Sequence, residues 1–530
     1  MIMRILVNAQ FPSLKTQQSP ISALAVRDGR ILALGSNDEM RALASPGDPI
    51  EDMQGRFILP AFCDAHIHLL EYGRSLSKVD CETSTLEACL ENVRRRVEKT
   101  PPGQWVLGHG WNHNNWNEGF GNAKMLDEIS SQHPIYLTAK SLHTSWANST
   151  ALKLAGIDAR STDPEGGIIL RDTNGQPTGI LLESAARLVE KVLPQPTADE
   201  NSRCILLAQT NLNKYGITSV HDFDTWDIFP ILQNLDQQAL LTLRVVKGIP
   251  QSFLPKAIER GIRSGQRSGN LQIGWLKLFS DGALGQQTAA LLEPYAGQPG
   301  NSGMLMMDAD EIVEIGRLAV KNRITLAIHA IGDRANRIVL DAYRNIRKIE
   351  SRLNIPHRHH RIEHVQLIQP NDQKRLAELG IIASMQPIHA LSDMVMAERY
   401  WGIRCANAYA WKSLLNNHAS LIFGSDAPVE SPNPFLGLAA AISRRRLDAD
   451  PASTGWFTEE CLTFEQAFQA FTIGPAYAAG SEDFLGKLAP GFDADLILLK
   501  ENPYTLSEQN LAVLLPEKTM MKGEWVWEGE

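Results

Sequence analysis

Residues 57–68 read Phe57-Ile58-Leu59-Pro60-Ala61-Phe62-Cys63-Asp64-Ala65-His66-Ile67-His68, an apolar run that ends in two histidines one residue apart. Side chains on a strand alternate between its two faces, so His66 and His68 would point the same way. By the same alternation Cys63 faces away from both. Two neutral imidazoles at the end of a buried strand suit a transition metal. The run therefore predicts a strand that carries part of a metal site.

A second pair with the same spacing, His357 and His359, lies in Pro356-His357-Arg358-His359-His360-Arg361. Its flanking arginines are typical of a solvated segment that leads into a strand. We interpret this second pair as structural.

Composition narrows the class of protein. The chain has 530 residues, 43% of them hydrophobic and 21% charged, with a net charge of −9. This length predicts two or three domains, and the acidic balance argues against a nucleic-acid partner. We find no apolar stretch of membrane-spanning length and no signal-peptide pattern at the start, so we expect a cytoplasmic protein. The six scattered cysteines, without a CxxC, are expected to be free thiols.

Seven more apolar, strand-like runs follow the first, with helical stretches such as 310–321 and 370–379 between them. They span 216–221, 241–246, 273–279, 324–329, 361–365, 381–386 and 420–426. Eight strands with helical returns predict an α/β fold of the (β/α)8 barrel, or TIM, type.

Polar residues fall at or near the ends of these strands. They lie on strands one, four, five, six and eight: His66, His68, Lys277, His329, His364 and Asp426. The carboxyl ends of barrel strands meet at one mouth, where the active site of such a fold lies. Six potential metal ligands would therefore converge there.

This set resembles that of the amidohydrolase superfamily of metal-dependent hydrolases. Within it, the chain is similar to the amidohydrolase type 3 group, which includes N-substituted formamide deformylases. The resemblance spans essentially the whole chain, and it is also carried by residues 163–169, 277–282, 329–335, 424–428 and 485–497.

The resemblance implies a role for each ligand. His66, His68 and Asp426 would bind an inner metal, His329 and His364 an outer one, and Lys277 would bridge the two. A plain lysine is a cation without a lone pair, so Lys277 would first have to react with CO2 to form a carbamate. The alternative for Lys277 is a barrel-interior lysine paired with Asp281 or Asp426.

The implied function is hydrolysis of non-peptide carbon–nitrogen bonds, with one or two divalent ions, zinc first among them. Metal-activated hydroxide would attack an amide such as an N-substituted formamide, and Asp426, the catalytic residue, would move the proton to the departing amine. Serine-hydrolase, HExxH and P-loop motifs are absent. Cyclic amidase, lactonase and deaminase reactions remain alternatives, as does a catalytically silent binding relative.

Three regions are expected. Residues 1–57 and 485–530 would form a composite β-sandwich, as the resemblance implies, with Asp28-Gly29 as a hairpin turn. Residues 58–70 and 211–484 would form the barrel. Residues 71–210 are too long for an ordinary loop, and since they leave the active-site face we interpret them as an inserted cap or substrate region.

The insert is rich in tryptophan and histidine, which favours a small amide substrate with an apolar or aromatic substituent. Candidate substrate-binding residues are Trp111, His143, Glu183, His221 and His389. Core packing is the alternative for each aromatic side chain. We expect no nucleic-acid or membrane partner, and a homodimer as one option.

Overall fold

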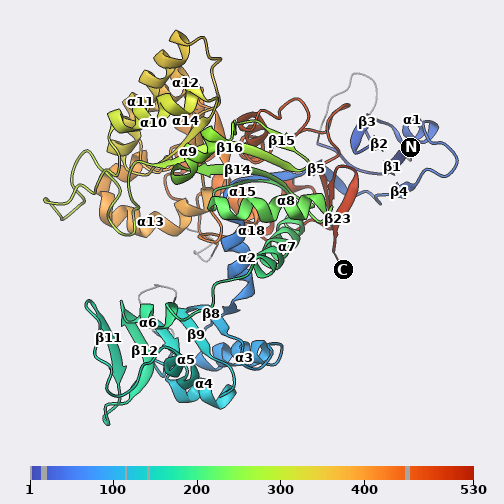
Figure 1. The fold of residues 1–530 in the computed structure, drawn as a ribbon. Coiled ribbons are helices and arrows are strands. Elements are labelled where there is room, and N and C mark those ends of the chain that lie inside the picture. Colours follow the sequence, from blue (N-terminus) through green and yellow to red (C-terminus); the bar gives the residue numbers. More distant parts are fainter. Residues whose placement is uncertain (1–2, 13–20, 114–115, 140–143, 448–453, 530) are drawn as a thin grey trace. The chain divides into compact units, whose positions relative to one another are not determined.

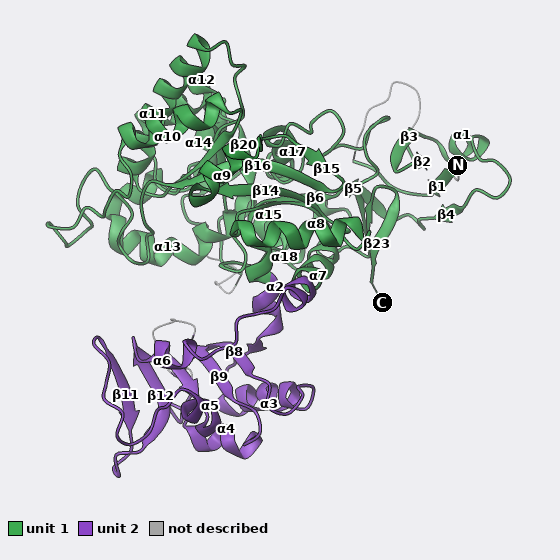
Figure 2. Ribbon diagram, in the orientation of Figure 1, with its two compact units in different colours: residues 1–72, 205–530 green, residues 73–204 purple. Residues whose placement is uncertain are grey.

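The computed structural model describes residues 3–12, 21–113, 116–139, 144–447 and 454–529. The chain forms two compact units, residues 1–72 with 205–530 (unit 1) and residues 73–204 (unit 2), coloured separately in Figure 2. It crosses between them within helices α2 (Leu69–Ser77) and α7 (Ala198–Lys214). At the crossing, a Cβ on Gly73 would lie only 2.1 Å from the carbonyl oxygen of Cys204. The two passages of the chain therefore run in direct contact.

Eight parallel strands form a nearly closed barrel in unit 1 (Figure 1). In spatial order they are β6 (Phe62–Ile67), β13 (Ile217–Asp222), β14 (Arg244–Pro250), β16 (Leu271–Phe279), β17 (Thr325–Ala330), β18 (Arg361–His364), β19 (Ile382–Met385) and β20 (Leu421–Phe423). Nearly all of their residues are buried, as expected for strands covered on both faces. The α/β barrel predicted from the sequence is confirmed.

The barrel closes where the segment after β20 meets β6. Asp64 Oδ1 accepts hydrogen bonds from the backbone N–H groups of His66 and Ser425, both at 3.0 Å. Gly424 permits this approach, because a Cβ there would lie 2.4 Å from the backbone nitrogen of His66. The Asp64 carboxylate thus helps to join strand one to the segment after strand eight, close to the predicted metal ligands.

Helices return the chain between the strands. The main ones are α8 (Phe229–Gln237), α9 (Leu254–Glu259), α10 (Ala309–Lys321), α11 (Asp333–Arg352), α12 (Pro370–Leu379), α13 (Pro387–Trp401), α14 (Trp411–Asn416), α15 (Pro434–Ser443), α16 (Phe464–Ala470) and α17 (Ile473–Ala478). A capping box of Asp308 and Glu311 begins α10, as the sequence pattern of its first turn favours.

Strand eight ends at Phe423, three residues before its predicted end at Asp426. Two other strands differ more from expectation. The opening run is divided, since β5 (Phe57–Pro60) pairs with the tail of the chain and only β6 belongs to the barrel. Strand three begins later than predicted and extends to Pro250, because Lys247 and Gly248 continue the strand inside the barrel. Lys247 is tolerated there because its ammonium lies 2.9 Å from the Asp222 carboxylate.

The two ends of the chain, which are expected to form a composite β-sandwich, contribute two four-stranded sheets. One sheet contains β1 (Met3–Val7), β2 (Ala23–Arg27), β3 (Arg30–Gly35) and β4 (Ile50–Asp52); the other contains β5, β21 (Leu496–Leu499), β22 (Lys518–Met521) and β23 (Glu524–Glu528). Leu6 and Leu24 share one apolar core with Leu496 and Met520. Asp28 and Gly29 both have positive φ, 53° and 77°, as a tight hairpin turn between β2 and β3 requires.

Unit 2 has its own sheet and core. Its strands are β7 (Val79–Asp80), β8 (Val106–Trp111), β9 (Ile135–Ala139), β10 (Thr144–Ala147), β11 (Gly167–Arg171) and β12 (Pro177–Glu183), and its helices include α3 (Leu86–Val97), α4 (Ala123–Ile129), α5 (Ser149–Leu154) and α6 (Ala186–Glu190). Within the described residues, no helix of either unit combines the length and apolarity that crossing a bilayer demands. The role of unit 2 as a cap stays a prediction.

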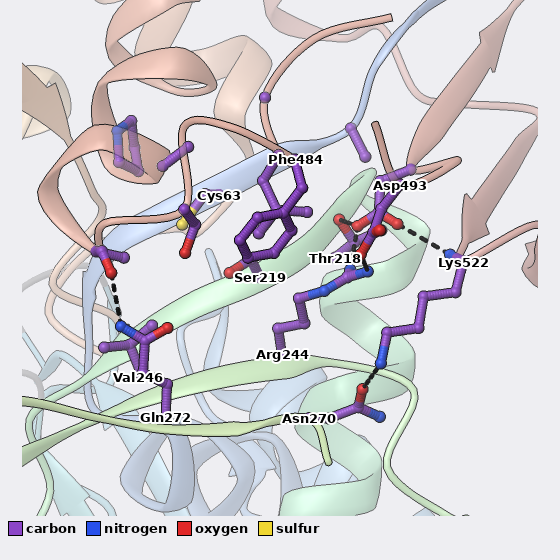
Figure 3. A pocket seen from close by; sticks show the side chains of 18 of the residues that line it. Cys63, Thr218, Ser219, Arg244, Val246, Asn270, Gln272, Phe484, Asp493 and Lys522 are labelled. Carbon is purple, nitrogen blue, oxygen red and sulfur yellow. Dashed lines mark hydrogen bonds and ion pairs between the residues drawn. The ribbon is translucent and has the colours of Figure 1, made fainter. Parts of the chain in front are cut away.

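A cavity of about 550 Å³ lies at the amino ends of the barrel strands, between the barrel and the sandwich (Figure 3). Its charged walls are paired with one another. The guanidinium of Arg244 donates to both Asp493, at 2.7 Å, and Asp495, while Thr218 Oγ1 donates to Asp495 at 2.9 Å. This network attaches the tail of the chain to the amino-terminal end of the barrel, the end opposite to the predicted site.

Candidate metal centre

Two groups of possible metal ligands converge at the carboxyl ends of the strands, and they share Asp426. His66 and His68 form one group with Asp426, and His364 and His389 form the other. Within each group the ligand atoms lie within 4.8 Å of one another. The ring of His329 lies beside that of His364, with centroids 4.6 Å apart. The structure thus brings the predicted histidines and aspartate together.

Each predicted metal-binding histidine has one ring nitrogen directed at an oxygen. The contacts are His66 Nδ1 to Glu363 Oε2 at 2.6 Å, His364 Nδ1 to Gln386 Oε1 at 2.9 Å, His329 Nε2 to the Gly282 carbonyl at 3.0 Å and His68 Nδ1 to Asp224 Oδ1 at 3.5 Å. An acceptor that takes the N–H of one nitrogen leaves the lone pair of the other for a metal. The residues therefore fit a divalent ion.

The electrostatics agree with this fit at three of the histidines. Burial, followed by the nearby charge of Lys277, lowers the pKa of His66 and of His329 to about 4 each. Burial also holds the pKa of His364 well below its usual value. Neutral imidazoles, the form that binds metals, are thus favoured at neutral pH.

Asp426 and His68 form the charged part of the centre. Burial raises the pKa of the Asp426 carboxyl, but the hydrogen bond with His68 and the neighbouring His66 outweigh it and hold that pKa well below the usual range. Burial lowers the pKa of His68, yet hydrogen bonds to Asp224 and Asp426 raise it to about 10. This part of the site stabilises a positive charge, which a divalent ion supplies as well as a proton does.

Lys277 ends the inward face of β16 and is 6% exposed. Its ammonium nitrogen lies 4.7 Å from the ring centroid of Phe223 and 5.1 Å from that of Phe279. Burial lowers its pKa to about 8. In the described part of the chain no ion pair within 4.0 Å involves Lys277, and Asp281 instead accepts three backbone N–H bonds.

The backbone is strained at two of the proposed ligands. His364 has a φ of 75° and Asp426 a φ of 61°, in the left-handed region that favours glycine. Such a residue costs of order 1–3 kcal/mol and persists where its surroundings fix it, often at functional sites. The backbone N–H of Asp426 donates to the His66 carbonyl at 2.7 Å, which joins the two ligands directly.

The predicted substrate-binding residues lie in different places. His221 is buried inside the barrel, where its Nδ1 accepts a hydrogen bond from Arg361 at 2.9 Å. Trp111 is fully buried in the core of unit 2 and donates to the Leu137 carbonyl, a placement that favours the packing alternative. Glu183 ends β12 in unit 2, and His143 lies outside the described residues. His389, in the first turn of α13, lies at the metal centre.

Sequence reasoning missed the residues that orient the ligands, above all Glu363, Asp224 and Gln386. A signal for Glu363 was present, because Arg361-Ile362-Glu363-His364 places two charges within one short buried strand. Buried charges are costly unless they are paired, so this pattern indicates a network. Arg361 donates to both carboxylate oxygens of Glu363, at 2.5 and 2.9 Å.

Comparisons with known proteins agree with this geometry. Protein LONG AFTER FAR-RED 3 of Arabidopsis thaliana is 32% identical over 497 residues, 91% of this chain and 84% of that protein. The N-substituted formamide deformylase of Arthrobacter pascens is 29% identical over 98% of this chain and 97% of its own length. The crystal structure of an uncharacterized metal-dependent hydrolase from Pyrococcus furiosus has a TM-score of 0.76 at 29% identity, covering 95% of this chain and 100% of that one.

The model of the amidohydrolase family matches residues 50–527, which include both sheets of the sandwich in part, the whole barrel and unit 2. The superfamily resemblance noted from the sequence is thereby confirmed. This chain belongs to the amidohydrolase family.

Proposed function

We propose that this chain hydrolyses carbon–nitrogen bonds outside peptides, with N-substituted formamides as the first candidate substrates. The observation that carries the proposal is the cluster of His66, His68, His329 and His364 near the ionised Asp426. In each of these histidines, one ring nitrogen is directed at an oxygen and the other is left for a metal. The similarity to N-substituted formamide deformylase over nearly the full length of both chains supports the choice of substrate.

His66, His68 and Asp426 would hold one divalent ion, and His329 and His364 a second. Such ions, zinc first among them, supply Lewis acidity for the substrate carbonyl and lower the pKa of a water. The protein contributes the fixed orientation of each imidazole, which Glu363, Gln386 and the Gly282 carbonyl provide.

Asp426 is the proposed proton carrier. Because its pKa is held well below the usual range, it is ionised at neutral pH and can accept the proton of the attacking water. It then passes that proton to the nitrogen of the departing amine. The products are the carboxylic acid and the free amine.

Lys277 is proposed to carry a carbamate, whose two oxygens would serve as ligands for both ions. Its amine would add to the carbon of CO2 and release one proton, a reaction that needs the neutral amine. Burial supports this step because it lowers the Lys277 pKa to about 8. Lys277→Ala should lose bound metal, with partial recovery on addition of short carboxylic acids. Retention of two ions by Lys277→Ala would remove the bridge from the proposal.

The remaining predictions concern the surroundings of the centre. Unit 2 is proposed as the cap that selects an apolar or aromatic substituent, with Glu183 and His143 as contacts from it. His221, which accepts a hydrogen bond from Arg361 inside the barrel, stays a proposed substrate-binding residue. A homodimer is proposed as the assembly.

A substrate screen tests the function. Protein reconstituted with zinc would be given matched N-formyl, N-acetyl and cyclic amides with the same N-substituent, together with a lactone and an aminopyrimidine. We expect the highest kcat/KM for the N-formyl series, and apolar N-substituents to be preferred within it. Preference for a cyclic amide, lactone or deamination would replace the formamide proposal, and zinc-loaded protein without any turnover would contradict hydrolysis.

A further inference from the structure

His389 differs from the other histidines of the centre in what its ring contacts. It is 7% exposed, lies in the first turn of α13, and has a ring nitrogen within 4.8 Å of ligand atoms of His364 and Asp426. Its Nε2 is buried and has no hydrogen-bond partner among the described residues. An unpartnered buried polar atom is costly, so its persistence beside a reactive centre calls for a ligand.

The group that contacts His389 Nδ1 decides whether Nε2 carries a proton or a lone pair. The four proposed metal histidines each face an oxygen, which leaves a lone pair on the opposite nitrogen. His389 Nδ1 instead faces an amide nitrogen, Gln366 Nε2, at 3.4 Å. The nearby carboxylate of Asp393 is engaged by the Tyr409 hydroxyl at 2.6 Å. With the Gln366 amide N–H donating to Nδ1, the proton of His389 lies on Nε2.

We infer that His389 is not a metal ligand but a catalytic hydrogen-bond donor, whose Nε2–H binds the substrate carbonyl oxygen as negative charge develops on it. Gln366 is the positioning residue that selects this tautomer. The inference rests on the proposed amide hydrolysis and adds to it the group that stabilises the oxyanion. The rings of His389 and His364 are nearly parallel, with centroids 6.3 Å apart, so the donor lies beside a metal ligand without replacing it.

Kinetics with metal analysis separate a donor from a ligand. Removing one such donor typically costs 10²- to 10³-fold in kcat. We expect His389→Ala to lose roughly this much kcat with unchanged zinc content. His389→Asn, which keeps an N–H donor, should recover part of the loss. Lower zinc occupancy in His389→Ala, or unchanged kcat, would overturn the inference.

The tautomer can be read directly in zinc-loaded, full-length protein labelled with ¹⁵N-histidine. Long-range ¹H–¹⁵N spectra distinguish the two ring nitrogens, and the signals missing from His389→Asn identify His389. We expect the proton on Nε2. Gln366→Glu can only accept at this position, so it should move the proton to Nδ1 and lower kcat toward that of His389→Ala. A protonated Nδ1 in the unaltered protein would overturn the inference.

A matched control and a product probe complete the design. Gln373 is a buried glutamine on α12, and Gln373→Glu should change neither the His389 spectrum nor kcat. Formate, the acyl product expected from a formamide, should shift the Nε2–H resonance of His389 on titration. No shift with formate contradicts the donor role even if no amide is turned over. Failure of the substrate screen alone would contradict only the proposed function.

Discussion

Strand β18 has a buried set of arginine, glutamate and histidine at each end, and the two sets differ in one respect. At the amino end, Glu350 contacts Arg347 at 2.7 Å and His360 at 3.1 Å, and His360 Nδ1 also accepts from the backbone of Leu326 at 3.0 Å. Both nitrogens of His360 are therefore satisfied. At the carboxyl end, Glu363 binds Arg361 and His66 Nδ1, but His66 Nε2 lies 3.6 Å from Asp426.

The comparison teaches that residue types alone do not mark a site. Both sets are buried and internally paired, and both are expected to stabilise the fold. Only at the carboxyl end is a histidine nitrogen left beyond hydrogen-bond range and aimed at an ionised carboxylate. The cavity at the amino end gives the same lesson, since its Arg244 is paired with Asp493 and Asp495, and neither group of possible metal ligands found among the described residues lies there.

The largest expected effect is at the carboxyl end of β18, where His66 Nε2 lies beyond hydrogen-bond range of Asp426. Asp426→Asn removes the proton acceptor, and general acid–base catalysis contributes about 10²- to 10⁴-fold, so kcat should fall by that factor. Steady-state kinetics of zinc-loaded protein measure it, with circular dichroism to show a retained fold. Asp341→Asn, on the exposed face of α11, is the control and should keep full turnover. A wild-type kcat in Asp426→Asn would contradict the catalytic role assigned to the carboxyl end of β18.

At the amino end of β18 we expect a substitution to lower the free energy of unfolding and to leave kcat unchanged. Glu350→Gln leaves Arg347 buried without its countercharge, and breaking such a pair costs about 3 kcal/mol of unfolding free energy. Urea denaturation measures the loss. Zinc affinity and kcat of the folded protein should not change. A fall in either would show that the Glu350 set at the amino end of β18 also contributes to the metal centre.

Glu363→Gln, at the carboxyl end of β18, is the change that matches Glu350→Gln at the amino end. The amide accepts from His66 less strongly than the carboxylate does, and such changes cost about 10- to 100-fold in metal affinity. Zinc competition titrations measure this, alongside Glu350→Gln. Equal zinc affinity in the two variants would remove the distinction between the two ends.

The smallest expected effect is at the sandwich. Gly29→Ala forces a side chain to a φ of 77°, with its Cβ only 3.0 Å from the Lys522 carbonyl, and should cost about 1 kcal/mol of stability. Thermal unfolding measures it. Gly300→Ala, which meets no neighbouring atom and has no positive φ, is the control. Full kcat is expected in both, and a loss in Gly29→Ala would link the sandwich to the centre.

The eight barrel strands could be predicted along the chain because each buried strand is an apolar run between turn or helix signals. The division of residues 57–68 between two sheets could not, since both halves are equally apolar and only the distant tail decides that β5 pairs with β21. The sequence predicts strand three too early, because Lys247 looks like the end of a strand until its partner Asp222 is known.

The ligands could be predicted because histidines and an aspartate at strand ends are a local pattern. Their orienting partners depend on which strands are neighbours and on the stagger between them. Glu363 and His66 are far apart in sequence and meet across the barrel. The tautomer proposed for His389 depends on a contact between Gln366, after β18, and α13, which no periodicity encodes.

The contact of Gly73 with Cys204 has a consequence for how the chain folds. Strands β6 and β13 are neighbours, yet all of unit 2 lies between them in sequence. Closing so long a loop costs entropy, roughly in proportion to the logarithm of its length. If unit 2 folds first, its own packing brings the two passages of the chain together, and the barrel then closes over a link made only of residues 68–72 and 205–216. Substitutions that unfold unit 2 should therefore slow the folding of the barrel.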